Sequence, residues 1–266
     1  MANQVFLLVL GFVLTTVVGG FLGFYYQRRT WDANRRESER TAAASVFDEI
    51  SRAMDERLYR MRLVYWGIKQ GNDERIVSAM GKYREALFKW NDNLNRNLAL
   101  AYRYFGRDVW AFLSGVLYEE FAIIGRHLEG QVRHRGDPAA RPGHADRPYV
   151  SGRRLQALSN DIYDLNRFII SMIQRGWVGL YLGERREHEG RPWTKDLSFG
   201  SKSTQVVFWQ RDLVRAGHGP LEVDGWFGQA TSDATKAFQD ENGLDADGVV
   251  HTSTRSKMAE VVAAAS

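Results

Sequence analysis

The chain has 266 residues, of which 44% are hydrophobic and 26% charged, and this balance excludes a wholly disordered or collagen-like protein. It contains no cysteine, so disulfide scaffolds, cysteine-ligated metal sites and thiol nucleophiles are excluded. The chain carries a net charge of +4, yet residues 194–266 hold 7 Lys and Arg against 10 Asp and Glu. Because this acidic part follows a basic remainder, we do not expect a uniform surface for nucleic acid, and nucleic acid is not predicted as a partner.

An uncharged apolar stretch of 22 residues, 5–26, lies near the beginning of the chain. A helix of this length is about 33 Å long, which is enough to cross the hydrocarbon core of a membrane. No basic residue precedes the stretch and no small-residue cleavage site follows it, so we interpret it as an uncleaved anchor and not as a signal peptide. The sequence therefore predicts a single N-terminal transmembrane helix in a lipid bilayer, followed by a basic juxtamembrane segment over 27–40.

Apolar residues recur at steps of three and four over four segments of the middle region. These segments are residues 46–68, 76–98, 109–128 and 155–172. Such spacing places the apolar side chains on one face of a helix. Short connections at 71–72 and Gly106 predict antiparallel neighbours, with Asp73 and Asp108 as N-caps. We therefore predict an antiparallel four-helix bundle over 41–182, whose first helix can continue from the anchor.

Two segments of this region are expected to lie outside helices. Residues 130–153 contain three prolines and several arginines, which is typical of a solvated basic loop, and residues 183–196 form a charged linker. An even number of antiparallel helices brings the chain back to the end of the bundle at which the first helix enters, its entry side. The C-terminal module is therefore expected at the entry side, unless the linker is stretched. The Tyr and Trp residues of the bundle are assigned to its core and to partner contacts. The bundle is thus predicted to be a spacer and a docking surface for a membrane protein or a second copy.

Two related turns stand 23 residues apart in the C-terminal region. Asp224 to Thr231 reads DGWFGQAT, and Asp247 to Thr254 reads DGVVHTST. An Asp-Gly pair forms a tight turn in which glycine adopts a positive φ, and the threonine can cap the next helix. We predict a small three-helix module over 197–266, which makes the whole chain all-α. In its first helix Val206, Trp209, Leu213 and Val214 are expected to face inward, with Gly217 as the left-handed residue after it.

The ordered residues of this module resemble the peptidoglycan-binding family 1 domain, over residues 197–260. The matching positions are Leu197, Gly200, Val206, Gln210, Leu213, Gly217, Asp224, Gly225, Phe227, Gly228, Thr231, Phe238, Gln239, Gly243, Leu244, Asp247, Gly248 and Thr254. The resemblance implies binding of cell-wall glycan and peptide without chemistry. In this sequence Ser203 and His251 replace glycines of the family pattern, and Trp209 takes the place of a leucine. His251 adds a β-carbon to the second turn.

Most residues of the shared pattern are interpreted as structural. They are Asp224, Gly225, Phe227, Gly228, Thr231, Phe238, Asp247, Gly248 and Thr254. Their polar and aromatic neighbours are the candidates for peptidoglycan binding, since an aromatic face packs on sugar C–H groups and amides bond to hydroxyls. These candidates are Trp226, Gln229, Gln239 and Asp240. No metal site and no cofactor is predicted.

The charges after the predicted span conflict with the location of a cell-wall ligand. Five arginines follow the span: Arg28, Arg29, Arg35, Arg36 and Arg40. The positive-inside rule would place the C-terminal bulk in the cytoplasm. Wall binding would require it in the periplasm, outside a bacterial inner membrane. We give the module's resemblance more weight and predict the periplasmic location.

The sequence favours a non-enzymatic, membrane-anchored cell-wall binding protein that acts as a tether or scaffold. No metalloprotease motif, no serine-hydrolase motif and no cysteine nucleophile is present. One alternative is a membrane-tethered or releasable endolysin with an unrecognised helical catalytic domain, for which Glu119 and Glu120 are the residues to test. We expect one of these two glutamates to be exposed and the other to pair with an arginine. A second alternative is a cytoplasm-facing scaffold or sensor.

Overall fold

The computed structural model describes residues 2–134, 152–184 and 195–264, with side chains described from Gly11 onward. Most of the predicted basic loop and of the predicted linker lies outside the described residues. The described chain is helical, which confirms the all-α prediction. Its elements are α1 (Ala2–Gln70), α2 (Asp73–Ala111), the π-helix η1 (Phe112–Leu117), α3 (Tyr118–Arg133), α4 (Gly152–Arg175), the 3-10 helix η3 (Gly179–Glu184), α5 (Thr204–Arg215), α6 (Gln229–Glu241) and α7 (Thr252–Ala264).

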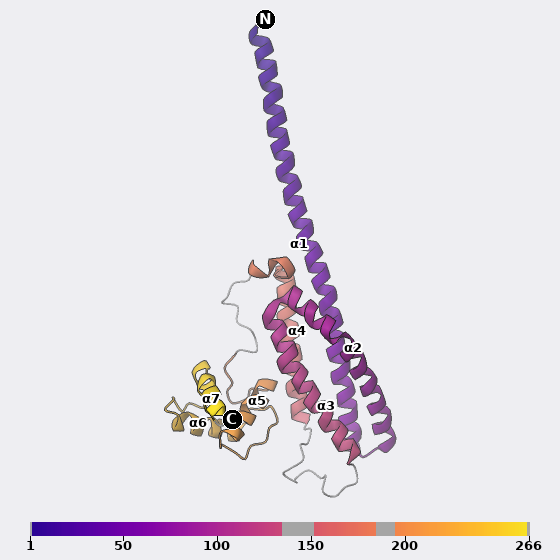
Figure 1. Cartoon of the computed structure of the whole chain (residues 1–266), viewed down its shortest axis with the longest axis vertical. Helices are drawn as coiled ribbons and strands as arrows, with labels where there is room; N and C mark the ends of the chain where they lie inside the picture. Colours follow the sequence, from indigo (N-terminus) through magenta and orange to yellow (C-terminus); the bar gives the residue numbers. More distant parts are fainter. Residues whose placement is uncertain (1, 135–151, 185–194, 265–266) are drawn as a thin grey trace.

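The C-terminal half of α1 packs with α2, α3 and α4 into a bundle whose neighbouring helices run in alternating directions (Figure 1). The chain reverses within α2 at Gly106, where a φ of 83° and a ψ of −179° interrupt the helix. The segment after Gly106 continues through η1 into α3, and together they form the third helix of the bundle. The bundle core is apolar, as the heptad-like spacing requires. It includes Met54, Met61, Tyr83, Trp90, Phe105, Phe121, Ile124, Leu158, Leu165 and Ile169.

The N-cap of α2 is one residue earlier than predicted. The side chain of Asn72 accepts a hydrogen bond from the backbone N–H of Arg75 at 2.9 Å. Asp73 and Glu74 lie instead in the first turn, where their charges favour the positive end of the helix dipole. The cap prediction for Asp73 is therefore wrong, because the preceding Asn has the extended backbone that an N-cap needs.

The two glutamates that begin α3 have opposite environments. Glu120 is fully buried, and its Oε2 accepts from Arg154 Nη2 on α4 at 2.9 Å, while Glu119 is exposed. This confirms the expectation that one glutamate is exposed and the other paired with an arginine. Arg211 of α5 lies 3.8 Å from both Glu119 and Glu120, so this group of charges also joins the bundle to the C-terminal module.

The prediction of a transmembrane helix is wrong. In the part of the chain that the structure describes, no helix is long and apolar enough to cross a membrane. Four glycines and two threonines between Gly11 and Tyr26 lower the mean hydropathy of the uncharged stretch. The predicted single-pass location in the inner membrane depended on this transmembrane helix, so that prediction is wrong as well.

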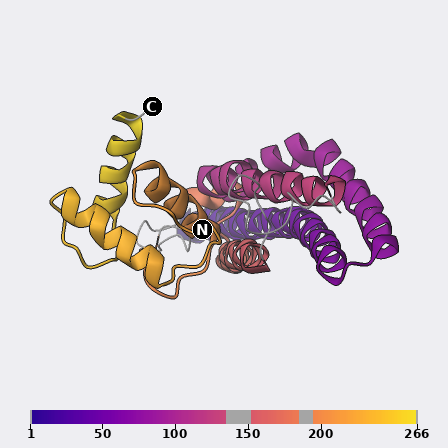
Figure 2. The same ribbon diagram turned by 90° about the horizontal axis from the view of Figure 1, so that it is seen from below.

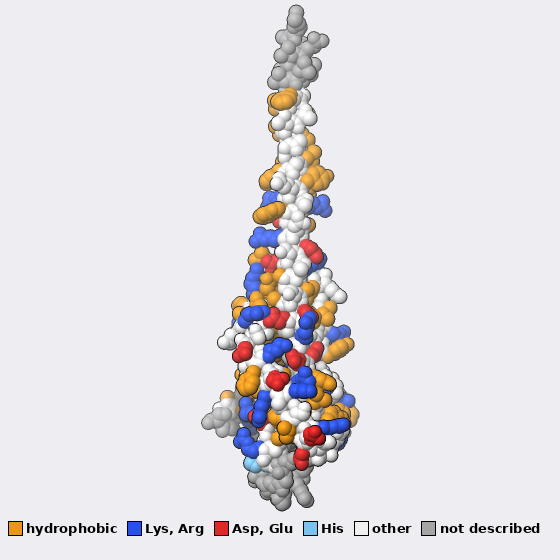
Figure 3. Space-filling model, turned by 90° about the vertical axis from the view of Figure 1, so that its right-hand side faces the viewer, with side chains coloured by type: hydrophobic (Ala, Val, Ile, Leu, Met, Phe, Trp, Pro, Cys, Tyr) orange, Lys and Arg blue, Asp and Glu red, His pale blue; other side chains and the backbone are white. Residues whose placement is uncertain are grey.

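Helix α1 is one continuous element that extends well beyond the bundle (Figure 1). Along the projecting part, large apolar side chains are exposed, and charged side chains become frequent only closer to the bundle (Figure 3). These exposed side chains include Phe12, Leu14, Val17, Phe21, Phe24, Tyr26 and Trp31. The first bundle helix therefore does continue from the apolar stretch, as expected.

The C-terminal module is built from α5, α6 and α7 around a second, separate core. Its buried residues are Leu197, Val206, Trp209, Leu213, Phe227, Phe238, Val250 and Met258. Gly217 follows α5 with a φ of 89°, as predicted for a left-handed C-terminal residue. Val214 was expected to face inward, but it is 42% exposed because it lies at the edge of the buried face of α5.

The module docks on the N-terminal half of α4, at the end of the bundle far from the projecting part of α1 (Figures 1 and 2). Asp161 Oδ2 accepts from the backbone N–H of Thr204, the first residue of α5, at 2.5 Å. Asn160 Nδ2 donates to the carbonyl of Lys202 at 3.1 Å. The module therefore lies at the opposite end of the bundle from the end at which α1 enters it, and not at the entry side.

This docking contact predicts a pH dependence of stability. Burial raises the pKa of Asp161 from 3.8 to about 7, with smaller contributions from the nearby acids Asp164 and Glu120, while its hydrogen bonds with Thr204 act in the opposite direction. The folded state therefore binds an additional proton between these two pH values, and its free energy of unfolding falls as the pH rises through that range. We expect Asp161→Asn, which keeps the acceptor for Thr204, to remove this slope in denaturant titrations. An unchanged slope in the variant would contradict the assignment.

Candidate functional site

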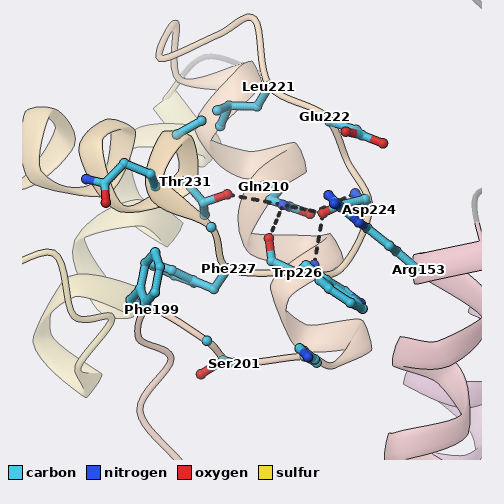
Figure 4. Close-up of a pocket in the computed structure, with 15 residues that line it drawn as sticks. Arg153, Phe199, Ser201, Gln210, Leu221, Glu222, Asp224, Trp226, Phe227 and Thr231 are labelled. Atoms are coloured by element: carbon cyan, nitrogen blue, oxygen red, sulfur yellow. Dashed lines mark hydrogen bonds and ion pairs between the residues drawn. The ribbon is translucent and has the colours of Figure 1, made fainter.

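A buried glutamine on α5 holds the first Asp-Gly turn. Gln210 is 1% exposed, and its Oε1 accepts from the backbone N–H groups of Asp224 and Gly225 at 3.1 and 2.9 Å. Its Nε2 lies 3.0 Å from Asp224 Oδ1, 3.1 Å from the Trp226 carbonyl and 3.2 Å from Thr231 Oγ1 (Figure 4). Because one amide satisfies both the beginning and the end of the turn, it fixes the position of the residues between them.

A second glutamine repeats this arrangement on α6. Gln239 Oε1 accepts from the N–H of Gly248 at 2.8 Å. Its Nε2 lies 3.0 Å from Asp247 Oδ1, 2.9 Å from the Val249 carbonyl and 3.3 Å from Thr254 Oγ1. Each acceptor has its counterpart in the first turn, so the repeat seen in the sequence corresponds to a repeated hydrogen-bond network.

This network corrects two sequence predictions. Gln239 was expected among the exposed candidates for binding, but it is 1% exposed, and its side-chain hydrogen bonds among the described residues all lie within the module. Thr231 and Thr254 were expected to cap helices. Instead Gly228 is the N-cap residue of α6, and both threonines are buried acceptors for the glutamine amides.

The histidine that replaces a glycine in the second turn does not distort it. None of the described non-glycine residues has a positive φ, so His251 occupies a backbone conformation open to any side chain. Its ring nitrogens lie 2.9 Å from Asp247 Oδ2 and 2.8 Å from Asp196 Oδ2. Hydrogen bonds to the carboxylate of Asp247 and, next in size, to that of Asp196 raise the pKa of His251 above its ordinary value.

A pocket of about 380 Å³ opens beside the first turn, and its lining belongs to the module except for Arg153 of α4 (Figure 4). Its wall includes Phe199, Lys202, Trp226, Gln229 and, from the bundle, Arg153. The strand-like segment before α5 places one side of it, since Lys202 and Trp226 form an antiparallel bridge. The pocket therefore combines an aromatic face with amide and charged groups, which suits a ligand with both sugar-like and ionic parts.

Trp226, which lines this pocket, lies next to two cations. Lys202 Nζ lies 4.0 Å from the centroid of its ring, and the guanidinium carbon of Arg153 lies 4.8 Å from it. Both distances are within the range of cation–π attraction. The indole Nε1 is buried and has no hydrogen-bond partner among the described residues.

The structure brings together two of the four residues predicted to bind the wall. Trp226 and Gln229 both line the pocket, whereas Gln239 is internal and Asp240 is exposed on α6 outside it. Sequence reasoning missed Lys202 and Arg153. No local pattern marks either residue, because each joins the pocket only through tertiary contacts. Within the described ranges, no group of three or more His, Asp or Glu side chains is placed to hold a metal ion.

The buried glutamine network predicts a large effect on stability. Gln239→Ala leaves the N–H of Gly248 and the carboxylate of Asp247 without their partner, so we expect the free energy of unfolding to fall by about 2–4 kcal/mol. Gln229→Ala is the matched control, because Gln229 is exposed and bonds only to Asp233 among the described residues. Its effect should stay within about 0.5 kcal/mol. Equal effects of the two variants in chemical denaturation would refute the structural role of Gln239.

Comparison with known proteins agrees with this module. Residues 202–258 match the model of a protein family described as a peptidoglycan binding domain. No curated protein and no solved structure matches the chain. The matched segment begins at Lys202 and ends at Met258, so it contains both glutamine networks and leaves Arg153 outside. The C-terminal module is thus identified as a peptidoglycan-binding domain of that family.

Proposed function

We propose that this protein is a non-enzymatic cell-wall binding protein that acts as a tether or scaffold. The observation that carries the proposal is the family match over residues 202–258, which supports a cell-wall binding role. The pocket at Trp226 supplies the surface for this binding, and the bundle serves as a spacer and a docking surface for another protein.

The chemistry of the pocket supports a wall fragment as its ligand. The partly buried ring of Trp226 in the pocket wall offers an apolar surface for sugar C–H groups, and the exposed Gln229 offers an amide for hydroxyls. Lys202 adds a positive charge for the carboxylates of wall peptides. Peptidoglycan contains all three kinds of group, so the pocket fits it better than a purely apolar or purely ionic ligand.

The surface of the bundle supports a docking role. Large aromatic side chains remain exposed on its helices, namely Tyr59, Trp66, Phe88, Tyr102 and Tyr163. The projecting part of α1 exposes further apolar side chains. Aromatic residues are enriched at protein interfaces, and exposed apolar side chains often mark such interfaces. A protein partner or a second copy of this chain is the occupant that this surface suits.

The positions of the two candidate acids argue against a hydrolase. A glycan-cleaving site needs a carboxylic acid that reaches the substrate, with a second carboxylate in most mechanisms. Glu120 is fully buried and paired with Arg154, and Glu119 lies on the surface of α3 near Arg211. Neither residue lies among those that line the Trp226 pocket.

Sedimentation with purified, insoluble peptidoglycan tests the proposal. We expect the full chain to pellet with it, and Trp226→Ala to reduce the bound fraction about tenfold because the stacking surface is lost. Trp66→Ala is the matched control, since Trp66 is exposed on the bundle away from the pocket. Far-UV circular dichroism and thermal unfolding show whether each variant is folded.

Failure of the wild-type chain to pellet would overturn the wall-binding proposal. A clearing band on a gel that contains peptidoglycan would overturn its non-enzymatic part, especially if Glu119→Gln or Glu120→Gln abolished the band.

A further inference from the structure

One residue that lines the Trp226 pocket, Arg153, belongs to the bundle and not to the peptidoglycan-binding domain. Arg153 lies in the first turn of α4, 49 positions before the start of the matched segment at Lys202. Its Nη1 lies 3.1 Å from Asp224 Oδ2, and its guanidinium stands over the Trp226 ring. The side chain is nevertheless 55% exposed, so it faces the pocket and not the interior of the interface (Figure 4).

The position of Arg153 is fixed by a whole face of α4. Ala157, Asn160 and Asp161 follow it at helical spacings of four, seven and eight, and each contacts the module. Ala157 meets the turn at Gly225, Asn160 donates to the Lys202 carbonyl, and Asp161 accepts from Thr204. Arg153 is therefore held at the pocket by the docked helix and does not reach it as a free surface side chain.

Two cations, Arg153 and Lys202, lie at the Trp226 ring, while the exposed acid Glu222 also lines the pocket. Among the described residues, one of the five N–H donors of Arg153 is committed to Asp224, which leaves donors of its planar fork for a ligand. Lys202 Nζ lies 4.0 Å from the centroid of the same aromatic ring. A carboxylate accepts hydrogen bonds from both a guanidinium and an ammonium group. The neighbouring acid Asp224 is already satisfied by Gln210, the Trp226 N–H and Arg153.

We infer that Arg153 is a ligand-binding residue of a composite site, and that the site takes a peptide with a free carboxylate. This inference rests on the proposed wall binding and names the part of the wall that is recognised: the peptide, through its carboxylate, with the sugar on the tryptophan. The bundle then determines ligand choice as well as spacing, because it supplies a donor from outside the segment that matches the family.

Binding of soluble disaccharide–peptide fragments to the full chain tests this inference. The fragments come from purified peptidoglycan and are used with free carboxylates and after chemical amidation of those carboxylates. Titration calorimetry should show that Arg153→Ala weakens binding of the free-carboxylate fragment about tenfold. Amidation should weaken binding to the wild type similarly and have little further effect on the variant. Arg153→Lys should recover only part of the affinity, because it keeps the charge and loses the fork.

Arg167→Ala is the matched control, since Arg167 is an exposed arginine of the same helix that stands over Tyr163. Its affinity should equal that of the wild type. If Arg153→Ala binds the fragments with wild-type affinity, the inference is overturned and the proposed function stands. The same holds if the variant binds more tightly, because Arg153 would then block the pocket. Loss of wild-type binding to both insoluble peptidoglycan and the fragments would instead remove the proposed function itself.

Discussion

The turn that presents Trp226 depends on a close backbone approach at Gly225. A β-carbon there would lie 2.7 Å from Ala157 Cβ of α4 and 3.0 Å from Val207 Cγ2 of α5, and the φ of 78° already disfavours a side chain. The turn is therefore pressed between the bundle and its own module, while Gln210 holds it from inside. Because these constraints act on adjacent residues, the indole of Trp226 has a defined place at the edge of the interface.

The second Asp-Gly turn shows what is special about the first. Gly248 also has a positive φ, but the atoms nearest to it belong to Ser232 and Lys236 of α6, within the module. The two turns share the same glutamine network, yet only the first lies against α4. The module thus contains two similar turns, and they differ because only the first contacts α4. That contact places Arg153 beside the first turn and its pocket. This difference gives the bundle a direct part in the site.

The local features were predictable from sequence because they depend on neighbouring residues. Helical periodicity located the bundle rods, and the Asp-Gly pairs and Gly217 located the turns of the module. The roles of Thr231 and Gln239 could not be predicted from neighbouring residues. A threonine near the start of a helix usually caps that helix, but the hydroxyl of Thr231 accepts a hydrogen bond from the buried amide of Gln210 on another helix. Gln239 is likewise buried by contacts with the second turn. The prediction of a membrane span was wrong because it considered only the length of the apolar stretch and its lack of charge. It did not take into account that the glycines and threonines lower the mean hydropathy of the stretch. The contribution of Arg153 arises from surface fit between α4 and Gly225, which no periodicity encodes.

The most direct test of the account is the indole N–H resonance of Trp226 in the full chain, observed while soluble peptidoglycan fragments are added. Trp209 is an internal reference, because its Nε1 already donates to Thr235 at 2.9 Å inside the module core. The account predicts that the Trp226 resonance shifts and that the shift saturates, while the resonance of Trp209 stays in place. Saturable binding that leaves the Trp226 resonance unmoved would contradict it.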